Sequence, residues 1–274
     1  KRQVAGMTIA NLAGVPLASF LAWAVSWRAA FAIAAAAALI TFAAIRITVP
    51  KVPALPDSGF AAQFRFLRSL EPWLVLGAIG LGNGGFFAYY SYVNPVMEHV
   101  AAVPASMMSV VITLAGAGMV LGNLFCAKIS SSFSDESLAA AGQGVLLLSL
   151  ASVFFLAHWS PAAIALTTLA AGCVFFISGP EQVLMIRNAK EGQLLAASLA
   201  QVSFNAGNAV GAWLGGLPID AGKAANWAAM PGFFLALAGF GLLFVNWLIH
   251  RVREEERTAG RIAALQDQIQ SKAP

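Results

Sequence analysis

Long apolar runs separated by short polar breaks occupy most of the chain. Each run is about 20 residues long, which is the length that an α-helix needs to cross the hydrocarbon core of a membrane. The runs cover residues 4–26, 29–48, 73–97, 105–127, 138–158, 162–182, 194–217 and 228–250. They are continuous, whereas the strands of a membrane β-barrel alternate apolar and polar positions over about ten residues. We therefore predict an all-α integral membrane protein with eight transmembrane helices.

Composition supports this prediction and excludes two other classes of protein. The 274 residues are 59% hydrophobic and 10% charged, whereas a soluble domain carries about 25% charged residues. A soluble fold could not cover its surface with so few charges, and a disordered chain needs low hydrophobicity. The lipid bilayer is thus the first partner that we predict. Despite the net charge of +4, we predict no nucleic-acid partner.

The longest polar break, at residues 49–72, divides the chain and is rich in proline. Within it, residues 60–70 are predicted to form a short amphipathic helix on the membrane surface. The predicted parts of the chain are two transmembrane helices in residues 1–48, the loop at 49–72, six helices in 73–250 and a polar, helical tail in 251–274.

Basic residues indicate how the helices are oriented. With an even number of spans, both ends of the chain lie on the same side of the membrane, and every Lys and Arg except Arg28 and Lys223 falls on that side. Cytoplasmic loops carry an excess of Lys and Arg. We therefore predict that both termini, the loop at residues 49–72 and the tail face the cytoplasm.

Three stretches carry motifs, at residues 6–18, 88–95 and 196–216. The second reads Ala-Tyr-Tyr-Ser-Tyr-Val-Asn-Pro. The residues that mark the first and third are Gly6, Asn11, Gly14 and Pro16, and Gly207, Gly211 and Gly215. These stretches resemble the fifth, seventh and eleventh helices of the major facilitator superfamily, and most closely its bacterial arabinose-efflux-permease-like, drug/proton-antiporter branch.

This resemblance implies both the architecture and the activity of the chain. It implies a partial major-facilitator-type bundle, with two helices of the N-terminal half, a central loop at residues 49–72 and the six-helix C-terminal half. Four further helices are then expected outside this sequence, which would be a fragment of the transporter. The implied activity is alternating-access transport in the bacterial cytoplasmic (inner) membrane, with proton-coupled efflux of a small amphipathic or sugar-like molecule and no cofactor.

The alternative is a membrane protein that does not transport, such as a scaffold, a subunit or an intramembrane enzyme. The sequence contains no HExxH, Walker or haem-binding motif. Cys126 and Cys173 lie alone in apolar runs without metal-ligand spacing. We therefore predict neither an enzyme nor a metal site, and the sequence does not indicate an oligomeric state.

Placing a polar side chain inside a membrane costs free energy, so such residues usually have a structural or functional role. Two sets share a helical face, because spacings of three, four and seven residues place side chains on one side of a helix. The first set consists of Asn83, Phe87, Tyr90 and Asn94, and the second of Gln201, Asn205 and Asn208. We predict that both sets line a central substrate cavity. The alternative is that they form hydrogen bonds between helices.

Glycine repeats predict close contacts between helices. The three glycines of the third stretch recur every fourth residue, and so do Gly118 and Gly122. Sliding surfaces for a rocking motion need the same smoothness. The run at 73–97 contains five glycines from Gly77 to Gly85, which predicts either a locally broken or bendable helix or a packing surface.

Glu181 is the acidic residue that falls inside a predicted span. It follows Gly179 and Pro180 near the cytoplasmic end of its run, where an interfacial residue facing water or a basic loop is the usual case. The alternative is a role in proton binding, which makes Glu181 the candidate for proton coupling. The sequence pattern places Asp135 and Glu136 in a loop.

Overall fold

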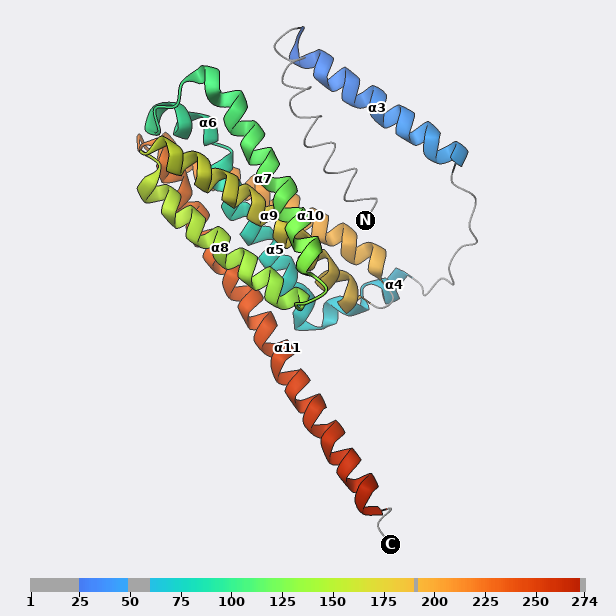
Figure 1. Cartoon of the computed structure of the whole chain (residues 1–274). Coiled ribbons are helices and arrows are strands. Elements are labelled where there is room, and N and C mark those ends of the chain that lie inside the picture. The colour runs from blue at the N-terminus through green and yellow to red at the C-terminus, as the bar shows by residue number, and fades with distance from the viewer. Residues whose placement is uncertain (1–24, 49–59, 190–191, 272–274) are drawn as a thin grey trace.

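The computed structural model describes residues 25–48, 60–189 and 192–271 (Figure 1). Gly6, Asn11, Gly14 and Pro16, together with most of the first predicted span, lie outside the described residues. Within the described ranges every regular element is a helix. The longer helices are α3 (Trp27–Thr48), α5 (Leu70–Tyr90), α7 (Met108–Ile129), α8 (Asp135–Leu156), α9 (Ser160–Asn188), α10 (Gln193–Asp220) and α11 (Ala229–Ser271).

The all-α membrane architecture is confirmed. Five helical segments of the described ranges are long and apolar enough to cross a membrane: Phe31–Thr48, Ala105–Ile129, Asp135–Leu156, Ser160–Asn188 and Ala225–Glu256. The two remaining long helices, α5 and α10, have sufficient length but do not belong to this set. They carry the clustered glycines and most of the predicted site residues.

Helix α3 does not contribute to the packed core. Every residue from Phe31 to Thr48 is exposed, and the helix stands apart from the others in Figure 1. The short α4 (Phe60–Gln63) and a 3₁₀ helix at Arg65–Arg68 occupy the segment for which the sequence predicts one amphipathic helix. The packed unit consists of the helices from α5 to α11.

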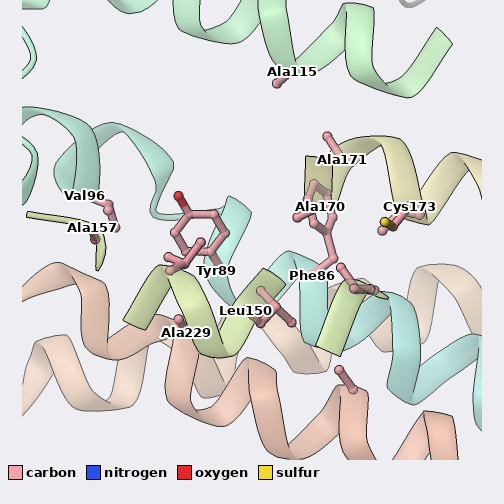
Figure 2. Packing of buried hydrophobic residues seen from close by; sticks show 14 of the residues in the cluster. Phe86, Tyr89, Val96, Ala115, Leu150, Ala157, Ala170, Ala171, Cys173 and Ala229 are labelled. Carbon is pink, nitrogen blue, oxygen red and sulfur yellow. The ribbon is translucent and has the colours of Figure 1, made fainter. Parts of the chain in front are cut away.

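Two central helices organise this unit. Helix α5 packs against α10 and α11, whereas α9 packs against α7 and α8. The long helices of the packed unit form two consecutive sets of three, namely α5, α7 and α8, followed by α9, α10 and α11. The first helix of each set packs on the second and third helices of the other set, as in a structural repeat. Figure 2 shows the rings of Phe86 and Tyr89, from α5, close to Leu150 of α8 and to Ala170 and Ala171 of α9.

Glycines line the seams at which the helices approach most closely. A Cβ atom added to Gly207, Gly211 or Gly215 of α10 would fall well inside van der Waals contact with a backbone carbonyl oxygen of α5. The same holds for Gly122 of α7, which faces the carbonyl of Gly172 on α9. Side chains at these positions would push the helices apart. The glycine repeats therefore set the distance between α5 and α10 and the distance between α7 and α9.

Helix α5 differs from the sequence prediction in two ways. It runs unbroken through its glycines, so the expectation of a locally broken helix is wrong, and most of these glycines face atoms of neighbouring helices instead. It ends at Tyr90, before the predicted end at Met97. Pro95 explains this end, because a proline cannot donate to the carbonyl four residues earlier, at Ser91. A short helix, α6 (Val93–Pro95), and a π-helix at Val96–Val100 follow.

The start of α8 and the end of α11 also differ from expectation. Asp135 and Glu136 form the first turn of α8 rather than a loop, because the hydroxyl of Ser134 accepts a hydrogen bond from the Ser137 N–H at 3.3 Å and caps the helix. The tail is not a separate element: α11 continues to Ser271 and projects far beyond the bundle in Figure 1.

Candidate functional site

Aromatic side chains from α5 and α10 meet on one side of the bundle. Phe87 and Tyr90 of α5 are partly buried, and their ring centroids lie 6.2 Å apart at an interplanar angle of 83°. Phe204 of α10 approaches Phe87 in the same edge-to-face manner, at 6.1 Å. Such pairs leave apolar ring surface on the two helices that an organic molecule could contact.

The amides of α10 border this aromatic group. Gln201 and Asn205 are exposed, and Asn208 is half-buried with its Oδ1 atom lacking a hydrogen-bond partner. Gln201, Asn205 and Asn208 lie at spacings of four and three residues and therefore share one face of the helix. Phe204 stands on the same face, three residues after Gln201 and four before Asn208. Our sequence prediction omitted it, although this spacing could have revealed it.

The two remaining asparagines of the predicted stripe lie elsewhere. Asn94 is exposed on α6, beyond the end of α5 at Tyr90, so it does not continue the helical face of Phe87. Asn83 is fully buried. The structure therefore brings Phe87 and Tyr90 together with Phe204, which shares a face of α10 with the amides, and it turns Asn83 toward the interior.

Asn83 faces Glu181 of α9 inside the bundle. Glu181 is 2% exposed, so the interfacial position favoured by the sequence is wrong. Its carboxyl group interacts with the Asn83 side chain, and its Oε1 atom has no hydrogen-bond partner among the described residues. Asn83 Nδ2 donates to the carbonyl of Ile79 at 2.8 Å, and its Oδ1 atom is unpartnered. One of the two N–H groups of the Asn83 amide is thus engaged within α5.

A second buried carboxyl group lies at the basic end of the bundle. We use this name for the end where α5 and α8 begin and α9 ends, which carries Lys128, Arg187, Arg251 and Arg253. Glu136 is 2% exposed, and its Oε1 atom accepts a hydrogen bond from Arg187 Nη2. His250 Nε2 lies 3.3 Å from the same oxygen. One carboxylate oxygen therefore joins α8, α9 and α11.

Comparison with known proteins identifies the fold. The family model described as Major Facilitator Superfamily matches residues 3–194. The chain belongs to the major facilitator superfamily. It is 36% identical to the putative transporter AraJ of Escherichia coli K12 over 88% of this chain and 61% of AraJ. It is 30% identical to the inner membrane transport protein YdhP of the same organism, with the same two coverages.

A third relative extends the range of the family. The purine ribonucleoside efflux pump NepI of Shigella sonnei is 26% identical over 78% of this chain and 54% of NepI. This major facilitator chain spans about three fifths of the length of the first two relatives, at 61% each.

A separate apolar groove lies elsewhere on the major facilitator bundle. It has a volume of ≈ 1360 Å³ and is lined by side chains of α7, α8 and α9, among them Leu121, Phe125 and Leu169. None of the aromatic or amide residues of the α5–α10 site lines it. Among the described residues, no group of three or more His, Cys, Asp or Glu side chains could hold a metal ion.

Proposed function

We propose that this chain is part of a secondary transporter of the bacterial inner membrane that exports a small amphipathic or sugar-like molecule in exchange for protons. Family membership and the similarity to NepI, a purine ribonucleoside efflux pump, support transport in the outward direction. The aromatic rings of α5 and α10 and the amides of α10 form the proposed substrate surface. An orientation with the basic end toward the cytoplasm follows from the positive-inside rule.

The contact between Asn83 and Glu181 is the observation that supports proton coupling. One N–H of Asn83 Nδ2 donates to the Ile79 carbonyl, so the neutral amide can meet Glu181 with its second N–H or with its oxygen. A protonated Glu181 can be buried beside this amide, whereas an ionised carboxylate would be buried without a basic partner among the described residues. We propose that transport alternates between these two forms of Glu181.

Reconstitution of the full-length gene product in proteoliposomes tests this proposal. Uptake driven by an imposed pH gradient should be measured with labelled adenosine, inosine and arabinose, and exchange of the same compounds should be measured without a gradient. Glu181→Gln should abolish the gradient-driven flux while exchange at equal pH persists, because only the proton step is removed. Glu98→Gln is the matched control, since Glu98 is exposed. Gradient-driven flux that survives in Glu181→Gln would contradict the assignment.

The amide residues need a second pair of variants. Asn205→Leu and Asn83→Leu should each reduce transport while folded protein is recovered in normal amount. Asn205 is exposed beside the aromatic group, and Asn83 contacts Glu181. Loss of folded protein in both variants would instead favour the alternative that these amides join helices.

A further inference from the structure

Glu136, Arg187 and His250 form a cluster that binds the end of α9, the helix that carries Glu181. Arg187, which binds Glu136, lies six residues after Glu181 on α9, or about 9 Å along the helix axis. Pro180 separates the segment from Glu181 to Asn188 from the preceding part of α9. It leaves the carbonyl of Phe176 without its usual helical donor. The last two turns of α9 are therefore joined to the rest of the helix at a weakened point and are held at their far end by Glu136.

The carboxylate of Glu136 is shared by an arginine and a histidine. Its Oε1 atom is shared by the Arg187 guanidinium and the His250 imidazole, and its Oε2 atom is buried without a hydrogen-bond partner. A neutral imidazole offers this carboxylate at most one uncharged hydrogen bond. A protonated imidazole adds a second positive charge to the same oxygen, and charge-assisted bonds are about twice as strong as neutral ones. Histidine is the side chain whose charge changes between about pH 5 and 8.

We propose that Glu136 and Arg187 are positioning residues for Glu181, and that His250 makes their hold on α9 depend on the pH at the basic end. This inference rests on the proposed function, because it assigns regulation to the same proton site. Acid on that face strengthens the hold and slows the movement of α9. A transporter that releases protons on this face would thereby slow down when they accumulate there.

Charged side chains from several helices lie at the end of the bundle where His250 stands. Helix α8 contributes Asp135 and Glu136, which interact electrostatically with each other and with Arg187 of α9. On α11 itself, Glu254 lies 3.9 Å from His250 Nδ1, and Arg251 is engaged by Glu255. The charge that α5 brings to this end, Glu71, is paired with Arg253. Two carboxylates, those of Glu136 and Glu254, thus lie 3.3 and 3.9 Å from the two nitrogens of the imidazole. The extra binding is present at low pH and is lost as pH rises, because the protonated state gains the partner.

Two variants at one position test the proposal in opposite directions. Exchange of labelled adenosine, inosine or arabinose, whichever is transported, is measured in proteoliposomes with equal pH on both sides, between pH 5.5 and 8. The native transporter should slow at least about fivefold from pH 8 to pH 5.5, a factor at the low end of typical coupling between sites. His250→Gln should remove most of this decline and keep the rate at pH 8. His250→Lys, which keeps a positive charge, should be slow at every pH. General damage to the fold cannot produce both results.

Controls separate this proposal from the transport mechanism itself. His99→Gln should keep the native pH profile, because His99 is exposed on the segment that follows α6. Arg187→Lys should retain part of the profile, since it keeps a charge at Glu136. A His250→Gln profile identical to the native one would overturn the proposal and leave proton coupling intact. Gradient-driven transport that is indifferent to Glu181→Gln would instead refute the proposed function, whatever His250 does.

Discussion

Two glutamates of this bundle are buried to the same extent, yet their surroundings differ. Glu136 and Glu181 are each 2% exposed. Glu136 meets the guanidinium of Arg187 and the imidazole of His250, whereas the side chain identified at the Glu181 carboxyl is the neutral amide of Asn83. Burial alone therefore does not distinguish a structural acid from a functional one. The partners do, because a compensated carboxylate can stay ionised and an uncompensated one is tolerated when it carries a proton.

Removing the partner of Glu136 should have the largest effect on stability. Arg187→Ala leaves a buried carboxylate with His250 as its remaining cationic partner in the described structure, and breaking a buried ion pair in this way typically costs about 3 to 5 kcal/mol. We expect a loss near the lower end, because the Arg187 side chain is itself 45% exposed. Equilibrium unfolding of the purified protein in detergent, followed by circular dichroism, measures this loss. A change below about 1 kcal/mol would show that Glu136 is not held as a charged group.

The same measurement on Glu181 should give a much smaller change. Glu181→Gln keeps the size of the side chain and provides an N–H donor for the unpartnered Oδ1 atom of Asn83. We expect the free energy of unfolding at neutral pH to change by less than about 1 kcal/mol, the net value of one hydrogen bond. A loss as large as that of Arg187→Ala would mean that Glu181 is ionised in the folded protein and that the contrast between the two acids is false.

The sequence predicted the helices well because membrane spans are local features. Hydropathy and length placed the starts of α7, α8 and α9 within three residues of their positions in the structure, since every apolar run must satisfy its backbone within itself. The end of α5 was missed because Pro95 was read as part of an apolar run. The first turn of α8 was missed although Ser134, followed by Asp135 and Glu136, is a typical helix start.

The candidate site was less accessible to sequence analysis because pairing across helices is not local. Helical spacing could group Phe87 with Tyr90, and Gln201 with Asn205 and Asn208. It could not show that Asn83 turns inward to a residue nearly 100 positions later. Glu181 looked interfacial because it lies late in an apolar run, yet α9 continues to Asn188 and keeps it inside. The partners of Glu136, on α9 and α11, carried no signal in the sequence at all.

A similarly small effect is expected for an ion pair at the surface of the basic end, and it tests the role of burial. Arg253 binds Glu71 and joins α11 to the start of α5, as Arg187 joins α9 to α8. The side chains of this pair are 56% and 20% exposed, so water can solvate both groups when the pair is broken. Arg253→Gln should therefore change the free energy of unfolding by about 0.2 to 1 kcal/mol, and added salt should weaken the effect. If unfolding experiments gave Arg253→Gln the same loss as Arg187→Ala, then pairing as such, rather than the burial of one partner, would govern stability at this end. The contrast between Glu136 and Glu181 would then need another explanation.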